Sequence, residues 1–257
     1  MSAMRLPSRA ELEAIAADAG QIALAQFRVV RAERKADRTL VTAADRAVEA
    51  RLAAALTAAF PDVGLLGEEG ALRDGAGPYR FVIDPIDGTS AFVAGLPTWC
   101  VCVGLMRGDE PVAGVVHLPC SGETYAAESG SAWWNGQPLP SLGAEPTGGD
   151  PFVLVDAGAH RRLQLRYRGK VRSLGSTAYH MLLVARGVAE GALLGPAHLW
   201  DLAAPGAVLA AVGGTMEYLS GAPVDLHVLA DGRRAAEHIL VAAPDRLAAL
   251  RPCFVRA

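Results

Sequence analysis

Cysteine, aromatic side chains and a surplus of basic residues are all scarce in this sequence of 257 residues. The four cysteines are too few for a disulfide framework in a chain of this length. Aromatic residues make up only 6% of the chain, which gives no support to a nucleobase pocket. The formal net charge is −3, whereas proteins that mainly bind nucleic acid usually carry excess positive charge. We therefore expect a cytoplasmic protein with reduced thiols and no nucleic-acid partner.

A long uninterrupted apolar segment is also missing. The most apolar region, residues 187–214, contains Glu190, His198 and Asp201 together with two prolines, so it is too broken to span a bilayer. The first residues lack a signal-peptide profile, and residues 9–27 instead carry apolar side chains at helical spacing. We expect no membrane association.

Apolar residues make up 51% of the chain, which is enough for one large domain or two closely packed ones. Cys100 and Cys102 alternate within a strand-like segment, so we expect both on one face of a strand as small core residues. The basic stretch HRRLQLRYRGK at 160–170 could attract an anion, but a solvated loop or an edge strand is the favoured explanation.

The first half of the chain mixes helices with many strands. Apolar residues at three- and four-residue steps predict a helix over 9–27 and a second helix that ends before Pro61. Strands are expected at 79–84 and throughout 99–139, with a tight Asn-Gly turn at 135–136.

The second half alternates strands and helices more regularly. Strands are predicted at 152–158, 189–195 and 215–219, helices at 177–187 and 199–214, and a strand and a helix within 233–250. A Gly- and Pro-rich segment at 141–151 is the expected boundary. It divides an α+β subdomain (1–140), which carries most candidate ligands, from an α/β subdomain (151–257), which carries Asp201. Layers of strands and helices indicate an α/β or α+β sandwich.

Acidic residues at the ends of apolar elements are the most unusual feature. The segment FVIDPIDGTSAF at 81–92 places Asp84 and Asp87 close together after an apolar strand, with Pro85 fixing the backbone between them. Like charges at that range repel, and a buried unpaired carboxylate is costly. Either both side chains face water, or a positive charge lies between them.

Other acidic residues have similar positions, and each has a structural explanation. Asp45 has the third helical position of a capping box that begins at Thr42. Asp201 can complement the dipole of its own helix start, and Glu68 and Glu69 can be solvated in a glycine-bracketed loop. A single role accounts for all of them, because hard cations such as Mg²⁺ take oxygen ligands and two-metal sites need bridging carboxylates.

The residues after Asp87 suit a phosphate group. The segment 88–95 predicts a short helix, and Gly88, Thr89 and Ser90 offer backbone N–H groups at its start. Such N–H groups bind phosphate dianions in many proteins. A phosphate group bound there would lie beside the candidate metal ligands.

At these residues the sequence resembles the inositol monophosphatase family, the Mg²⁺-dependent, lithium-sensitive phosphomonoesterases. GEE at 67–69, DPIDGTSAF at 84–92 and WDLAAPGAVLAAVGG at 200–214 match the family's signatures in order and spacing, with LVTAADRAVE (40–49) upstream. The resemblance covers nearly the whole chain. It implies a layered α/β/α/β sandwich, often assembled as a homodimer.

The resemblance also implies the metal ligands. Glu68, Asp84 and the carbonyl of Ile86 are expected to bind a first Mg²⁺ ion. Asp84 is expected to bridge to a second Mg²⁺ ion held with Asp87 and Asp201, and a third ion is possible in this family.

The remaining implied roles are catalytic and phosphate-binding. Thr89, paired with Asp45, is expected to orient and deprotonate the attacking water, and Glu68 belongs to the same catalytic set. The amides of Gly88 and Thr89, with Ser90, are expected to hold the phosphate.

The implied substrate is a small phosphorylated alcohol: an inositol phosphate, histidinol phosphate or a sugar phosphate. Gly175, Ser176, Thr177, Leu194 and Asp201 are the expected contacts to it. Inositol-specific members carry a glutamate where this chain has Leu194, and leucine cannot accept a hydrogen bond from a ring hydroxyl. This departure argues against inositol 1-phosphate as the principal substrate.

Two alternatives stay open. One is a 3′(2′),5′-bisphosphate nucleotidase of the same superfamily, and the other is a non-catalytic protein that binds a phosphorylated metabolite. Degenerate members should lose a metal carboxylate or the activating threonine, and this sequence retains them all. The family's usual asparagine is Ala91 here, which we expect to change packing only.

Overall fold

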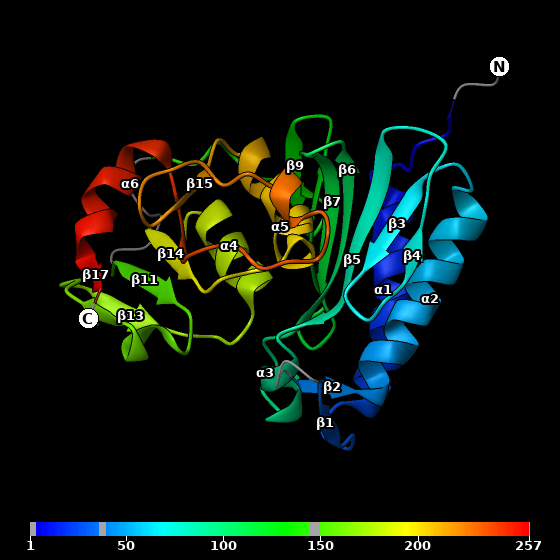
Figure 1. Cartoon of the computed structure of the whole chain (residues 1–257), viewed down its shortest axis with the longest axis horizontal. Coiled ribbons are helices and arrows are strands. Elements are labelled where there is room, and N and C mark those ends of the chain that lie inside the picture. Colours follow the sequence, from blue (N-terminus) through cyan, green and yellow to red (C-terminus); the bar gives the residue numbers. More distant parts are fainter. Residues whose placement is uncertain (1–3, 36–39, 144–149, 257) are drawn as a thin grey trace.

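Layers of helices and sheets build the structure, a computed structural model that describes residues 4–35, 40–143 and 150–256 (Figure 1). Helices α1 (Arg9–Gln26) and α2 (Ala43–Ala59) cover one face of a first sheet. Helices α4 (Thr177–Ala185) and α5 (Leu199–Ala211) lie between this sheet and a second one. The short helix α6 (Pro244–Leu250) packs against the second sheet. The predicted layered α/β/α/β sandwich is confirmed, and α6 adds an outer element.

The first sheet has eight strands in the described residues, in the order β10-β9-β8-β7-β6-β5-β3-β4. Only β3 and β5 pair in parallel; the other neighbours are antiparallel. The strands are β3 (Gly64–Gly67), β4 (Leu72–Arg73), β5 (Tyr79–Asp87), β6 (Cys100–Arg107), β7 (Glu110–Leu118), β8 (Glu123–Glu128), β9 (Ser131–Trp134) and β10 (Gln137–Pro138).

The second sheet has five strands in the described residues, in the order β13-β11-β14-β16-β15. Its strand β11 pairs in parallel with both of its neighbours. The strands are β11 (Phe152–Val155), β13 (Lys170–Arg172), β14 (Gly191–Leu194), β15 (Thr215–Tyr218) and β16 (Ile239–Ala242). Two small antiparallel pairs complete the fold: β1 (Ala32–Arg34) with β2 (Leu40–Thr42), and β12 (Leu163–Leu165) with β17 (Phe254–Arg256).

The two faces of strand β6 contribute side chains to two different hydrophobic clusters. Its side chains alternate, so Val101 and Val103 join the cluster beneath α1 and α2, while Cys100 and Cys102 join the cluster around α4 and α5. The expectation that the two cysteines share one face of a strand in the core is therefore confirmed. All four cysteines of the chain are free thiols.

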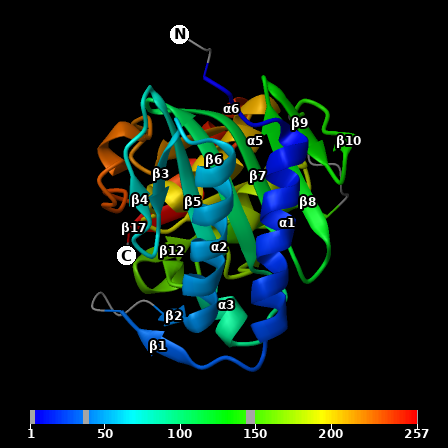
Figure 2. The ribbon, with the colours of Figure 1, turned by 90° about the vertical axis from the view of Figure 1, so that its right-hand side faces the viewer.

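Helices α1 and α2 run side by side across the first sheet (Figure 2). Ser8 caps α1, and its capping box includes Glu11. Helix α2 begins after Thr42 and ends at Ala59, so the predicted end before Pro61 is confirmed. The Asn-Gly turn is confirmed as well, since both residues have positive φ angles, 50° at Asn135 and 75° at Gly136.

Two expectations about strands need correction or completion. The strand expected at 79–84 continues to Asp87, because the chain resumes pairing with β6 after an irregularity. In the basic stretch, β13 forms an edge strand of the second sheet. The strands β12, in the same stretch, and β17, near the end of the chain, have too few residues to give a sequence pattern.

The proposed boundary at 141–151 falls largely outside the described residues, because 144–149 are not described, and the division at that point stays a prediction. None of the helices in the described residues is long and apolar enough to cross a membrane.

Candidate active site

An irregularity near the end of β5 brings two carboxylates to one place. Asp84 pairs with Cys102 and Asp87 with Cys100, so three residue steps on β5 match two on β6. Pro85 has no N–H to contribute to the ladder, and the N–H of Ile86 turns back to the Oδ1 atom of Asp84 at 3.0 Å. The exposed fractions of Asp84 and Asp87 are 1% and 4%, so both acids are buried.

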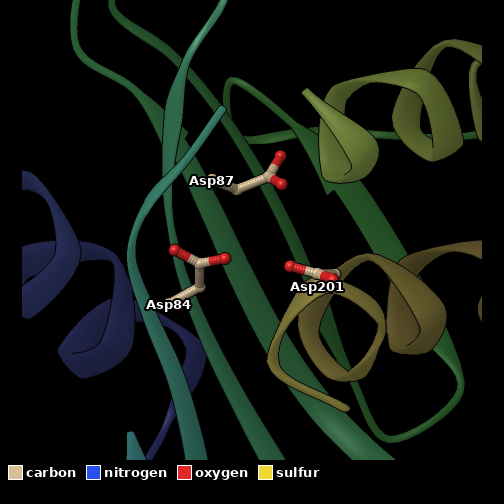
Figure 3. A group of neighbouring side chains, drawn as sticks. All are labelled: Asp84, Asp87 and Asp201. Atoms are coloured by element: carbon tan, nitrogen blue, oxygen red, sulfur yellow. The ribbon is translucent and has the colours of Figure 1, made fainter. Parts of the chain in front are cut away.

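A third carboxylate comes from the start of α5. The Oδ2 atom of Asp201 accepts a hydrogen bond from the N–H of His198 at 2.7 Å, which fixes the side chain at the helix N-terminus. Asp84, Asp87 and Asp201 each present an oxygen atom within 4.8 Å of the others. Figure 3 shows the two β5 carboxylates and the α5 carboxylate converging on one space.

The three carboxylates disfavour one another's ionisation. Burial and the nearby Asp87 and Glu68 raise the pKa of Asp201 to about 8. Burial, with Glu68, Asp87 and Asp201 close by, raises the pKa of Asp84 well above its ordinary value. A bound cation would remove this cost, and a cluster of buried oxygen donors suits a hard divalent ion. The residues therefore fit a Mg²⁺ centre.

Glu68, at the end of β3, lies beside this cluster, and the ammonium group of Lys35 contacts both Glu68 and Glu69. The Nζ atom of Lys35 is 2.9 Å from an oxygen of Glu68 and 2.6 Å from one of Glu69. Burial raises the pKa of Glu68, and the charge of Lys35 opposes that rise. Lys35 could not be predicted as part of the site, because it follows β1 within a run of charged residues that offers no spacing signal.

Glu49 on α2 holds the loop that carries Glu68. Its two carboxylate oxygens accept hydrogen bonds from the N–H groups of Glu69 and Ala71, both at 2.7 Å. Gly67 packs directly against this carboxylate, because a Cβ atom there would lie 2.5 Å from an oxygen of Glu49. Glu49 was not among the expected site residues, although its place within LVTAADRAVE, upstream of the metal-site signatures, offered a signal.

Asp87 is held by the start of α4. Its carboxylate accepts hydrogen bonds from the hydroxyl of Ser176 and from the N–H groups of Thr177, at 3.3 Å, and Ala178, at 2.9 Å. Burial raises the pKa of Asp87, and these donors oppose the rise. Ser176 and Thr177, expected as substrate contacts, thus lie where they also orient a candidate metal ligand.

Gly88 allows this close approach between β5 and the residues before α4. Its φ angle is +91°, and a Cβ atom there would lie 3.0 Å from the carbonyl oxygen of Gly175. Gly175, Ser176 and Leu194 line a small cavity of about 90 Å³ next to the site. Leu194 is the last residue of β14 and is 1% exposed.

Asp45 and Thr89 form a hydrogen-bonded pair. The Oγ1 atom of Thr89 lies 3.2 Å from an oxygen of Asp45 and 3.1 Å from the carbonyl oxygen of Ile86. The other oxygen of Asp45 accepts from the N–H of Thr42 at 2.8 Å and from its hydroxyl at 2.6 Å. The predicted capping box at Thr42 is confirmed, and Asp45 serves it while contacting Thr89. Burial raises the pKa of Asp45, which these hydrogen bonds oppose.

A cavity of about 630 Å³ joins these groups. Its floor holds the acidic residues Glu68, Asp84, Asp87 and Asp201, together with Gly88, Thr89 and Ser90. Its remaining lining residues are cationic, aromatic or apolar: Arg34, Lys35, Leu40, Ile86, Pro196, His198, Trp200 and Arg234.

Two aromatic residues that line this cavity, His198 and Trp200, stack against each other. The rings of His198 and Trp200 are 4.5 Å apart and nearly parallel. The Nδ1 atom of His198 donates to the carbonyl oxygen of Gly232 at 2.8 Å, so its Nε2 atom accepts from the Nε atom of Arg234 at 2.9 Å. His180 is not among the described residues that line this cavity; it lines the smaller cavity of about 90 Å³.

Known proteins resemble this chain in sequence and fold. Residues 7–250 match the model of the inositol monophosphatase family. The inositol-1-monophosphatase ImpA of Mycolicibacterium smegmatis is 35% identical over 215 residues, 78% of this chain and 77% of the relative. A histidinol-phosphatase of Chlorobaculum parvum is 37% identical over 211 residues, 78% of this chain and 81% of the relative.

The fold is shared with a solved structure as well. The crystal structure of the extragenic suppressor protein suhB from Bartonella henselae superposes with a TM-score of 0.82 at 24% identity, over 95% of this chain and 96% of that one. The layered fold and the buried acidic cluster define a metal-dependent phosphatase. The chain belongs to the inositol monophosphatase family.

Proposed function

We propose that this enzyme hydrolyses a small phosphate monoester with Mg²⁺ as its metal and a water molecule as the nucleophile. The observation that carries the proposal is the convergence of Asp84, Asp87 and Asp201 within one cavity, with the Asp45–Thr89 pair beside it. When bound by Glu68, Asp84, Asp87, Asp201 and the carbonyl of Ile86, Mg²⁺ would supply Lewis acidity that lowers the pKa of water and neutralises phosphate charge.

Two side chains, Thr89 and Asp45, accept the proton that the attacking water loses. Thr89 donates its hydroxyl hydrogen to Asp45, which leaves the Thr89 oxygen free to accept a hydrogen from the attacking water. As the water oxygen bonds to phosphorus, its proton passes to Thr89 and the Thr89 proton passes to Asp45. The P–O bond to the leaving group breaks, and the alkoxide takes a proton from solvent. Thr42 fixes the second oxygen of Asp45, so the base keeps its orientation.

The remaining residues position the phosphate and the ligands. Gly88, Thr89 and Ser90 line the cavity at the start of α3 (Thr89–Val93), where their amides would hold phosphate oxygens. Leu194 ends a buried strand and offers no hydrogen-bond acceptor, which supports a substrate other than inositol 1-phosphate. We further propose a homodimer in the cytoplasm, the latter supported by four free thiols.

Phosphate release from a panel of esters tests the function. The panel contains myo-inositol 1-phosphate, histidinol phosphate and fructose phosphates, each with Mg²⁺ or with EDTA. We expect Mg²⁺-dependent release from at least one ester, and a loss of about a thousandfold in kcat for Asp84→Asn, which removes a charge from the metal centre. Circular dichroism of the variant checks its fold. Release that persists in EDTA, or in folded Asp84→Asn, would refute the proposal.

A further inference from the structure

His180 on α4 is buried beside the candidate active site and has no role in the proposed metal centre. It is 3% exposed, and it lines the small cavity of about 90 Å³ that Gly175, Ser176 and Leu194 also line. This cavity adjoins the larger one, because Ser90 lines both. Burial of a polar side chain is costly unless the side chain is hydrogen-bonded, so the partners of both ring nitrogens matter.

The hydrogen bonding of His180 fixes which ring nitrogen carries the proton. The N–H of Leu174 donates to the Nε2 atom at 2.9 Å, so Nε2 is unprotonated. Burial lowers the pKa of His180 from 6.5 to about 4, so the ring is neutral at physiological pH. A neutral imidazole carries one proton, which must then lie on Nδ1. His180 therefore offers an N–H donor at Nδ1.

This donor is unpaired and faces open space. Within residues 4–35, 40–143 and 150–256, Nδ1 forms no hydrogen bond. It is also not among the side-chain atoms of these residues that are sealed from solvent without a partner, so it borders a space that solvent can enter. The cavity of about 90 Å³ is the space that His180 lines. The Nδ1–H group is therefore directed into this cavity, where a water or a ligand atom can accept its hydrogen.

The small cavity lies close to the reacting phosphate. Ser90, expected at the phosphate, lines it, and so do Ser176 and Thr177, which donate to Asp87. Its volume has room for only a few non-hydrogen atoms. The part of a substrate that fits there is the part of the leaving alcohol nearest the ester. Because the carboxylate of Asp156 also lines the cavity and disfavours a further anion, we expect a neutral acceptor.

From this arrangement we infer that His180 is a specificity-determining residue, whose Nδ1–H donates to a hydroxyl oxygen on the carbon next to the ester carbon of the leaving alcohol. The inference rests on the proposed function and adds to it a residue that selects the substrate. The contact involves a single ring atom, which agrees with the small exposed fraction of His180. An ester without this oxygen leaves the donor to water and is disfavoured.

A matched pair of esters isolates this oxygen. sn-Glycerol 3-phosphate and 3-hydroxypropyl phosphate have the same chain length and the same terminal hydroxyl, and only the first carries a hydroxyl next to the ester carbon. With Mg²⁺ present, we expect kcat/KM of the wild-type enzyme to be at least about fivefold higher for the glycerol ester. Where turnover of either ester is too slow to measure, inhibition constants against a hydrolysed ester of the panel give the same ratio.

Two variants at position 180 separate the proposed contact from a structural role. His180→Gln keeps an acceptor for the N–H of Leu174 and offers an amide N–H to the cavity, whereas His180→Met offers only a weakly accepting sulfur. We expect His180→Gln to keep a preference of at least about threefold, and His180→Met to treat the two esters alike within about twofold. Circular dichroism checks that both variants are folded. A purely structural role would lower kcat/KM equally for both esters and leave their ratio unchanged.

The position of the proton is tested without any substitution. Nitrogen NMR of the wild-type enzyme, labelled at its histidines, distinguishes the two neutral forms of the ring. We expect the proton of His180 on Nδ1. A proton on Nε2 would overturn the inference, because the cavity would then face no donor.

The outcomes of the kinetic experiments separate this inference from the proposed function. Equal values for the two esters in the wild type, or the wild-type ratio in folded His180→Met, would overturn the role of His180 while leaving the phosphatase function intact. Absence of Mg²⁺-dependent release from every ester of the panel would overturn the function and this inference with it.

Discussion

At the scale of single residues, the buried acids differ in what compensates their charge. Asp87 accepts three hydrogen bonds from the start of α4, and Asp45 accepts from Thr42 and Thr89. Asp84 and Asp201 instead face other carboxylates, which raise the pKa of both together with burial. Asp84 and Asp201 accept backbone hydrogen bonds from Ile86 and His198, but their charge is less fully compensated, so a cation is most strongly stabilised beside them.

His180 is a buried base whose neutral form shapes the segment before α4. Its Nε2 atom accepts a hydrogen bond from the N–H of Leu174 at 2.9 Å, and burial lowers its pKa from 6.5 to about 4. Because the unfolded chain takes up the proton at higher pH than the folded chain, this residue's contribution is complete above about pH 6.5. It is lost as pH falls from there toward 4.

The variant His180→Gln keeps an acceptor for the N–H of Leu174 and removes the titration. Between pH 7.5 and pH 5 we expect the wild type to lose about 2 kcal/mol more of its free energy of unfolding than the variant does. Urea unfolding of both proteins at the two pH values, in the same buffer with EDTA, measures this difference. An identical loss in both proteins would show that His180 does not titrate in this way.

At the scale of elements, the start of α4 joins the two sheets at the site. Ser176 caps α4, because its Oγ atom accepts from the N–H of Tyr179 at 3.0 Å, and its hydroxyl donates to Asp87 on β5. A helix of the second half therefore orients a carboxylate of the first. This contact explains why Ser176 is only 1% exposed, a smaller exposed fraction than a residue that contacts substrate needs.

Ser176→Ala and Ser8→Ala form a matched pair of cap variants. Each removes a helix cap, so we expect each to lower the free energy of unfolding by about 1 kcal/mol. Only Ser176→Ala removes one of the hydrogen bonds that hold the Asp87 carboxylate, and we expect it alone to weaken Mg²⁺ affinity by about tenfold. Urea unfolding and Mg²⁺ titration of both variants provide the two measurements. Equal Mg²⁺ affinities in the two variants would rule out the positioning role of Ser176.

Local sequence patterns predicted much of the fold, because its helices and strands bury regular faces. The turn at Asn135 and Gly136 and the capping box at Thr42 depend only on neighbouring residues, and both could be predicted. The continuation of β5 to Asp87 could not, because it depends on pairing with β6 across an irregular register.

The site shows the same division between local and long-range information. Asp84 and Asp87 are conspicuous in the sequence because charged residues follow an apolar run. Glu49 and Lys35 both contact the loop at Glu69, which is distant from them in sequence, so these contacts could not be predicted from neighbouring residues.

At the scale of the whole molecule, the proposed metal centre lies where the two halves meet. Asp84 and Asp87 come from the first sheet, and Asp201 from a helix packed between the sheets (Figure 3). The central core also contains residues of both halves, such as Val116 and Val241. We therefore expect the described fold to unfold as one cooperative unit that Mg²⁺ stabilises as a whole.

Equilibrium unfolding in urea, with Mg²⁺ or with EDTA, tests the central claim that the three aspartates hold a divalent cation. We predict a single transition for the wild type and a gain of about 2.7 kcal/mol at a Mg²⁺ concentration 100-fold above Kd. Asp84→Asn should lose this gain, while the control Asp156→Asn, outside the site, should retain it. The same Mg²⁺ gain in Asp84→Asn as in the wild type would contradict the assignment of the metal centre.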